Sequence, residues 1–340
     1  MPAKKVVVVG GGIVGCLTAL ELVNRGCQVT LVERNVVASQ TSGESSWAGA
    51  GILFPLLPWL YKDEVNQLAL SGANMYSALC KHLLTSTGID PEFIRCGMQI
   101  LAPSDKKMAT DWCLKNNISV QANAQGLFLP SVAQVRPPQL LKALRVALIQ
   151  SGITLLEHTE LQTLNQSEQL NSWQTTTGQV LEADQFVVTS GAWSFELLKN
   201  TAQHLDIKPM RGQILLYELT GEKLTHIVYK DGFYLVPRRD GLLLAGSTLE
   251  DVGFDKNTTE DVKLALQTKA ETILPSLKNA NILKHWSGLR PGTPENLPTI
   301  AAHQSIQNLY LNTGHFRYGL TMAPASAQRI ASIMCGNTTA

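Results

Sequence analysis

Three glycines with fixed spacing lie near the start of the chain, where they could bind a diphosphate. Gly10, Gly12 and Gly15 form a GxGxxG pattern between the β-branched run 6–9 and a predicted helix over 13–25. In that context the first glycine forms a tight turn, the second lets backbone approach a pyrophosphate, and the third lets helix and strand pack. The helix N-terminus adds N–H groups that can bind the anion. The pattern predicts a dinucleotide site and by itself leaves NAD and FAD open.

A carboxylate follows the second predicted strand, 28–32. Glu33 lies 18 residues after Gly15, where it can accept hydrogen bonds from both ribose hydroxyls and would repel a 2′-phosphate. The predicted cofactor contacts in this first segment are Gly10, Gly12, Ile13, Val14, Gly15, Glu33 and Arg34. The next segment, 38–51, consists mainly of small and polar residues, which indicates a loop where backbone closely approaches a ligand.

The remaining residue patterns exclude several other kinds of site. The seven histidines show no HExxH or paired metal spacing, and no GxSxG nucleophile elbow occurs, so no metal is predicted. The net charge is +1 and no Lys/Arg run exceeds two residues, which argues against nucleic acid as a partner. The six cysteines lack CxxC spacing, so we expect reduced thiols and a cytoplasmic location.

The elements that must position these residues follow from composition and periodicity. With 340 residues, 44% of them apolar and 16% charged, the chain suits two interlocked globular domains. Lys4 and Lys5 before an apolar run resemble a signal peptide, but the glycines interrupt that run. No uninterrupted apolar stretch of about 18 residues occurs, so no membrane span is expected.

The predicted elements divide the chain into two kinds of segment. An amphipathic helix is expected over 64–87 and buried strands near 6–9 and 186–191, whereas several strands separated by turns follow one another over 210–246. The fold class is therefore α/β plus α+β. We predict a discontinuous dinucleotide-binding domain of residues 1–90, 135–200 and 288–340, and an antiparallel-sheet substrate domain of residues 91–134 and 201–287.

Six sequence blocks carry a resemblance to a known family. They are "VVVVGGGIVGCLTALELVNRGCQVTLVER", "SSWAGAGIL", "SGAWS", "DGFYLVPRRDGLLLAGSTLE", "GLRPGTPENLPTI" and "NTGHFRYGLTMAPASA". In these blocks the chain resembles the D-amino-acid-oxidase-like FAD-dependent oxidoreductases, most closely the glycine oxidases of the thiamine pathway. The blocks follow the family order over essentially the whole chain. The resemblance implies FAD as cofactor and a Rossmann-like, glutathione-reductase-type FAD domain.

The resemblance also implies where the cofactor binds. Ser45 and Ser46 are expected near the phosphates, and Ala50, Gly51 and Ile52 near the flavin ring. Leu161 matches the position whose backbone meets the adenine. The pyrimidine end of the flavin is expected to meet His315, Phe316, Arg317, Tyr318, Gly319, Leu320 and Thr321. Tyr318 stands where relatives often carry Asn, and "SGLRPGTPENLPTI" lacks the cysteine that tethers FAD in related sarcosine oxidases, which implies noncovalent binding.

For the substrate, the resemblance assigns four residues. Arg290 matches the arginine that grips an amino-acid carboxylate, and its planar fork suits two parallel hydrogen bonds. Tyr234 matches the tyrosine that assists this grip, and Arg317 matches a residue lining the site. These three are the predicted catalytic residues. Leu249 is expected to help set the size of the pocket.

The implied activity is oxidation of a small amino acid or secondary amine. The α-hydrogen leaves as hydride to the flavin without a general base, and the imine hydrolyses to a 2-oxo acid and ammonia. Oxygen then reoxidises the flavin and forms hydrogen peroxide. The alternatives are a D-amino-acid dehydrogenase that passes electrons to a quinone, a tRNA-modifying FAD oxidoreductase, and a noncatalytic nucleotide-binding protein. The preferred amine, the acceptor and the oligomeric state, a homo-oligomer included, stay open.

Overall fold

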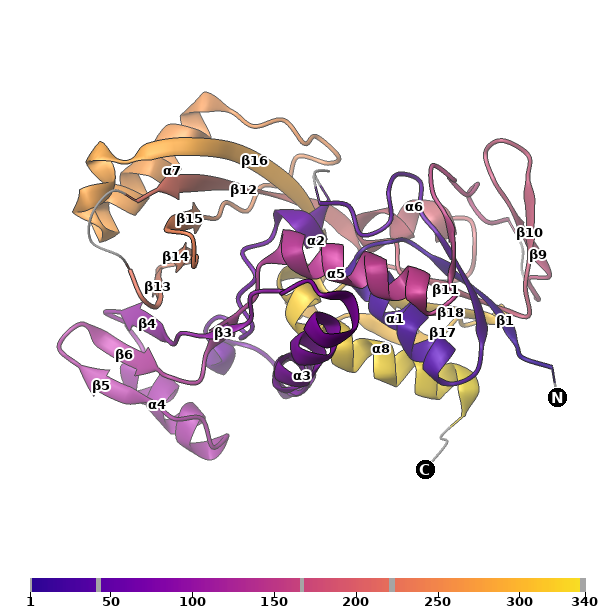
Figure 1. Ribbon diagram of the computed structural model, residues 1–340, viewed down its shortest axis with the longest axis horizontal. Coiled ribbons are helices and arrows are strands. Elements are labelled where there is room, and N and C mark those ends of the chain that lie inside the picture. The colour runs from indigo at the N-terminus through magenta and orange to yellow at the C-terminus, as the bar shows by residue number, and fades with distance from the viewer. Residues whose placement is uncertain (1, 41–43, 166–167, 220–223, 337–340) are drawn as a thin grey trace.

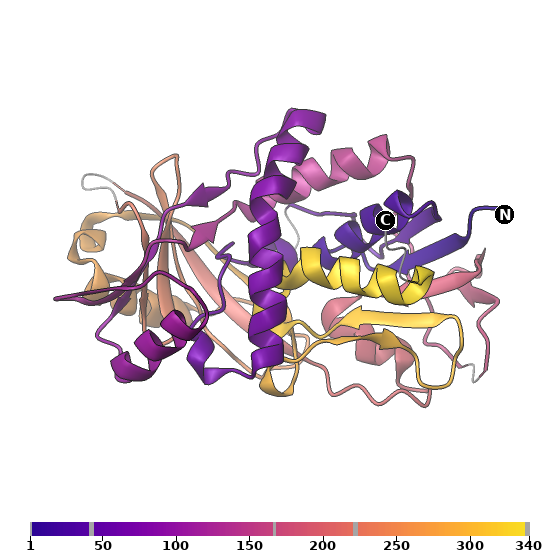
Figure 2. The same ribbon diagram turned by 90° about the horizontal axis from the view of Figure 1, so that it is seen from below.

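A computed structural model of the chain describes residues 2–40, 44–165, 168–219 and 224–336. Two sheets lie side by side along the long axis of the molecule, a six-stranded sheet near the N-terminus label and an eight-stranded sheet at the other end (Figure 1). Figure 2 shows helix α3 (Asp63–Thr87), drawn in purple, between the two sheet regions, where it meets the first turns of α8 (Gly319–Cys335).

The six-stranded sheet forms the dinucleotide-binding half and has the order β17-β18-β11-β1-β2-β8. Neighbouring strands run parallel except for the β17 and β18 pair. Its strands are β1 (Lys5–Val9), β2 (Gln28–Val32), β8 (Thr154–Leu156), β11 (Gln185–Val188), β17 (Thr299–Ala302) and β18 (Leu309–Thr313). All four residues of β11 are buried, as expected of a parallel strand covered on both faces.

Two apolar clusters cover the two faces of this sheet. Val6 and Val8 of β1 pack with helices α1 (Ile13–Asn24), α5 (Pro137–Gln150), α3 and α8. Val7 and Val9 point to the opposite face, because side chains alternate along a strand. They pack there with Trp173 and Leu181 of the hairpin β9 (Ser172–Gln174) and β10 (Val180–Glu182).

The eight-stranded sheet has the order β16-β12-β15-β14-β13-β4-β6-β5. Its strands are β4 (Met98–Leu101), β5 (Gln121–Asn123), β6 (Gly126–Leu129), β12 (Lys208–Glu218), β13 (Ile227–Lys230), β14 (Phe233–Pro237), β15 (Leu242–Gly246) and β16 (Asn281–Gly292). All pairs are antiparallel except β4 with β13. Helix α7 (Glu260–Ile273) packs on one face through Leu266 and Ala270, and residues that include Phe54 and Trp59 pack on the other.

Short elements connect these layers. They are α2 (Ser45–Ala48), α4 (Lys106–Lys115), α6 (Ser194–Leu198), β3 (Ile94–Arg95), β7 (Ala133–Gln134) and the 3₁₀ turns η1 (Pro58–Leu60), η2 (Gly191–Trp193), η3 (Pro275–Asn279), η4 (Pro294–Asn296) and η5 (Phe316–Tyr318). The segment predicted as a loop over 38–51 therefore contains one helical turn. Residues 41–43 of that segment lie outside the described residues.

The predicted fold class is confirmed, with a mainly parallel sheet in one half and a mainly antiparallel sheet in the other. The strands of the six-stranded sheet all fall in the ranges predicted for the dinucleotide domain. The predicted boundary at 287/288 falls inside β16, so the division into domains stays a prediction. Within the residues that the structure describes, no helix is both long and apolar enough to cross a bilayer.

Candidate active site

An elongated cavity of about 330 Å³ lies at the carboxyl ends of β1, β2, β11 and β18 and extends to the second sheet. Parallel sheets commonly bind ligands at this edge. Most of the predicted site residues line it, namely Gly10, Gly12, Ile13, Val14, Glu33, Arg34, Ser45, Ser46, Ala50, Gly51, Ile52, Leu161, Tyr234, Arg290 and residues 315–321. Gly15 and Leu249 do not.

The glycine turn connects β1 to α1. Gly10 has φ +112°, and a Cβ there would lie 2.8 Å from the carbonyl oxygen of Thr189 on the neighbouring β11 side. A Cβ on Gly15 would overlap the carbonyl oxygen of Gly10, so Gly15 acts by letting α1 pack on the turn. Gly12 lines the cavity, and a Cβ there would meet only the Ser46 hydroxyl, at 3.1 Å. The turn leaves open backbone facing the cavity.

Glu33 follows the last residue of β2 and closes the turn. Its two carboxylate oxygens accept hydrogen bonds from the Gly11 N–H (2.8 Å) and the Asn35 N–H (2.9 Å). Burial raises the pKa of Glu33, and these two hydrogen bonds oppose that effect. Each oxygen keeps a second lone pair, so the carboxylate can still accept ribose hydroxyls.

An aromatic residue that was not predicted as a site residue lies beside Arg34. The guanidinium carbon of Arg34 lies 3.8 Å from the centroid of the Trp193 ring, and the Lys256 ammonium lies 5.3 Å from the same ring. Lys256 also forms an ion pair with Glu44 (3.1 Å). Trp193 belongs to the block "SGAWS", whose only signal was its place in the family order, so its contact could not be predicted from local pattern.

His315 and Asn312 are buried residues of the cavity wall, and each has one side-chain atom without a partner among the described residues. His315 Nε2 and Asn312 Oδ1 form no hydrogen bond, and both residues line the cavity. Burial lowers the pKa of His315 to about 3, so its ring is neutral at physiological pH. Both atoms have almost no accessible surface, so the protein covers them on the side of the cavity too.

Tyr318 occupies the position where relatives often carry Asn. Its hydroxyl donates to the carbonyl oxygen of Leu56 (3.1 Å), and its ring packs edge-on against Tyr61 with centroids 5.4 Å apart. The hydroxyl therefore finds its acceptor in the protein, and Tyr318 links the cavity wall to residues 56–61.

Three of the predicted substrate residues come from separate elements, Arg290 from β16, Tyr234 from β14 and Arg317 from η5. Arg290 of β16 is half-buried, and its Nη1 and Nη2 atoms donate to Thr248 O (3.2 Å) and Ser247 Oγ (2.8 Å). Burial lowers the pKa of Arg290, and the neighbouring Tyr234 acts in the opposite direction. Arg317 also lines the cavity and forms no ion pair with a described acidic residue. Leu249 lies outside the lining with 43% of its surface exposed, so its predicted role in setting pocket size gains no support.

Comparison with known proteins identifies the family. A family profile described as "FAD dependent oxidoreductase" matches residues 5–333. The chain belongs to this family. The resemblance inferred from the six sequence blocks is thereby confirmed.

Similar proteins cover nearly the full length of this oxidoreductase. It is 39% identical to the glycine oxidase of Pseudomonas aeruginosa, with 98% of this chain and 95% of that protein covered. It is 27% identical to the solved glycine oxidase of Geobacillus kaustophilus, with a TM-score of 0.89 and coverage of 99% and 96%. It is 29% identical to the bifunctional protein ThiO/ThiG of Trichormus variabilis, where it spans 52% of that protein.

The cavity of this FAD-dependent oxidoreductase fits the cofactor that the family requires. The open glycine turn and the α1 N-terminus suit a diphosphate, and the Glu33 carboxylate suits a ribose. Across the described part of the chain, no group of three or more His, Cys, Asp or Glu residues could hold a metal ion.

Proposed function

We propose that the protein oxidises a small amino acid or secondary amine, as a glycine oxidase does, with noncovalently bound FAD. The observation that supports this most strongly is the pair of arginines at the end of the cavity that also holds His315. Arg290 and Arg317 both line this region, and neither forms an ion pair with a described carboxylate. An anionic group of the substrate would complete the charge balance.

Arg290 is the residue that would bind the substrate carboxylate. A guanidinium has five N–H groups, and Ser247 and Thr248 take two of them, which leaves donors for a bidentate contact. Tyr234 is buried beside it, with 7% of its surface exposed, and its hydroxyl would add a further contact. Fixing the carboxylate in this way orients the α-carbon of the substrate.

FAD, when bound, supplies the hydride acceptor for the amine oxidation. The protein supplies orientation and a partly closed site. With a pKa of about 3, His315 is too weak a base to hold a substrate proton at neutral pH. This agrees with the expectation that the reaction needs no general base.

Noncovalent attachment has a simple structural basis. None of the described residues that line the cavity is a cysteine, the residue type that tethers FAD in related sarcosine oxidases. The proposal also includes oxygen as acceptor, a cytoplasmic location and assembly into a homo-oligomer.

The decisive experiment is an anaerobic titration of the purified yellow protein with glycine, sarcosine, D-alanine and D-proline. Loss of the oxidised flavin absorption without added NAD supports the proposal, and admission of oxygen should restore the colour with formation of peroxide. Recovery with a quinone but not with oxygen would favour the dehydrogenase. If no amine reduces the flavin, the proposed substrate class is wrong. Acid precipitation should leave a colourless pellet, and a yellow pellet would contradict noncovalent binding.

A further inference from the structure

The Arg290 side chain lies directly on the backbone of the neighbouring strand. In the β12 and β16 pair, Arg290 is opposite Met210, and its guanidinium extends across Gly212, the next residue on the same face. A Cβ on Gly212 would overlap three atoms of the guanidinium, Nη1, Nη2 and Cζ. The absence of a side chain at position 212 therefore provides the space in which the Arg290 head lies.

The segment 247–250 provides the acceptors for this guanidinium. Thr248 O and Ser247 Oγ accept from Nη1 and Nη2. The segment itself is hydrogen-bonded to β12, because Arg211 and Glu250 exchange backbone N–H to O bonds of 2.9 Å in both directions. The positions of both acceptors of Arg290 therefore depend on this attachment to β12.

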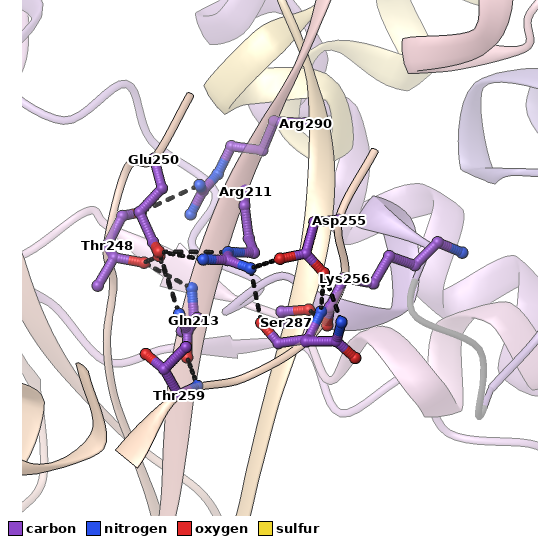
Figure 3. Close-up of polar contacts among 10 residues, drawn as sticks. Arg211, Gln213, Thr248, Glu250, Asp255, Lys256, Thr259, Ser287 and Arg290 are labelled. Atoms are coloured by element: carbon purple, nitrogen blue, oxygen red, sulfur yellow. Dashed lines mark hydrogen bonds and ion pairs between the residues drawn. The ribbon is translucent and has the colours of Figure 1, made fainter. Parts of the chain in front are cut away.

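The Glu250 carboxylate strengthens that attachment from the opposite face of β12 (Figure 3). It accepts from Arg211 Nη2 (2.7 Å), Arg211 Nε (3.2 Å) and Gln213 Nε2 (3.1 Å), and it also accepts from the Thr248 hydroxyl. The Gln213 N–H in turn donates to the Thr248 hydroxyl (2.9 Å). Glu250 therefore fixes the side chain of Thr248, and the carbonyl oxygen of Thr248 accepts the hydrogen bond from Arg290.

Arg211 is a well-fixed partner for Glu250. Only 4% of its surface is exposed, and its Nη1 donates to Asp255 Oδ2 (2.7 Å) and to the Asn257 carbonyl oxygen (2.8 Å). Burial raises the pKa of Glu250, but hydrogen bonds from Thr248, Arg211 and Gln213 outweigh it and lower the pKa below its ordinary value. Glu250 is therefore ionised at neutral pH.

We propose that Gly212 and Glu250 are positioning residues for Arg290, one by leaving room for its guanidinium and the other by fixing Thr248. The inference rests on the proposed role of Arg290 as the carboxylate-binding residue. Neither residue lines the cavity, so both act through Arg290. The β12 backbone at Gly212 lies under the guanidinium, and segment 247–250 supplies its two acceptors. Together they orient the remaining N–H groups toward the substrate carboxylate.

The test uses the FAD-loaded protein and the substitution Gly212→Ala. The overlapping atoms belong to the end of a flexible side chain, so we expect the fold to be kept and the guanidinium to move. A displaced guanidinium would lose a charge-assisted hydrogen bond to the carboxylate, so we expect the Kd for acetate, read from the flavin spectrum, to rise roughly 10- to 100-fold. The KM for glycine should rise in parallel, while kcat changes less.

The matched control is Gly292→Ala in the same strand pair. Its added Cβ would lie 2.5 Å from Met210 Cγ, so it also crowds a flexible side chain but not Arg290. We expect it to bind acetate like the unmodified protein. If both alanine variants weaken acetate binding equally, or if Gly212→Ala leaves it unchanged, the positioning role of Gly212 is overturned. A crystal structure of Gly212→Ala with an unmoved guanidinium would overturn it too.

The substitution Glu250→Gln tests the positioning role of Glu250 with almost no change in side-chain shape. Loss of the charge-assisted contacts with Arg211 should weaken acetate binding about tenfold, with FAD retained. Unchanged affinity would remove Glu250 from the proposal. Failure of this inference can be told apart from failure of the proposed function. An unmodified protein that binds acetate but oxidises no amine refutes the proposed function alone. An unmodified protein that does not bind acetate refutes the inference.

Discussion

Replacing Arg290 by methionine should separate substrate binding from stability. Arg290 is half-buried, burial lowers its pKa, and its described acceptors are a backbone carbonyl and a hydroxyl. No ion pair with a described carboxylate offsets the burial of its charge. Methionine fills a similar volume without a charge, so the free energy of unfolding should stay the same or rise.

The loss should instead fall on substrates that carry a carboxylate. Removing one partner of a desolvated charge pair costs about 2–5 kcal/mol, which corresponds to roughly 30- to 5,000-fold in kcat/KM. Glycinamide has the size of glycine and no negative charge, so Arg290→Met should not lower its turnover. Arg290→Lys should recover part of the glycine activity, because an ammonium restores the charge but not the two parallel hydrogen bonds.

Steady-state kinetics with glycine and glycinamide, together with urea unfolding, check this reasoning. An equal loss for both substrates in a variant that keeps its FAD would mean that Arg290 shapes the site without holding the carboxylate. A large fall in the free energy of unfolding would refute the stability argument.

Three further predictions concern other parts of the molecule. Arg145 lowers the pKa of Glu157, so Glu157→Gln should lower the free energy of unfolding by about 1 kcal/mol at pH 7. This difference should fade below the unfolded pKa of about 4.3, and urea unfolding at pH 7 and pH 3 would show it. A Cβ at Gly72 would overlap the carbonyl oxygen of Thr321, so Gly72→Ala should lower the free energy of unfolding by about 1–3 kcal/mol and weaken FAD binding. The control Ser71→Ala changes an exposed residue and should have neither effect. Thermal unfolding and FAD titration measure both. His315 has a pKa of about 3, so His315→Asn should not remove any inflection between about pH 5 and 8 from the kcat/KM profile, and loss of one would refute its neutral state.

Features that depend on local sequence could be predicted. The turn of Gly10, Gly12 and Gly15 needs only a strand, a glycine pattern and a helix in succession, and the structure has them as β1 and α1. The helix expected over 64–87 is α3, Asp63–Thr87, because its apolar stripe repeats over many turns. The residues assigned by resemblance line one cavity, with the exception of Leu249.

Features that depend on register between distant strands could not be predicted. Gly212 and Arg290 come together only because Met210 is opposite Arg290 in the β12 and β16 pair. The parallel pairing of β4 with β13 was likewise absent from the sequence pattern, which indicated an antiparallel sheet. Leu249 was assigned to the pocket by analogy with a family position, and nothing in its local sequence indicated that its side chain would be exposed.

The strand order of the six-stranded sheet also determines when the cofactor site can form during synthesis. β1 emerges first from the ribosome, yet its neighbour β11 comes about 180 residues later, and β18 and α8 come after about 300 residues. At about 5–20 residues per second, the glycine turn waits roughly 15 to 60 seconds for the helix that contains Thr321. For the first part of that interval, roughly 9 to 36 seconds until β11 is made, the valines of β1 lack their strand partner on one edge and are available to chaperones. FAD is therefore expected to load only after α8 has been translated.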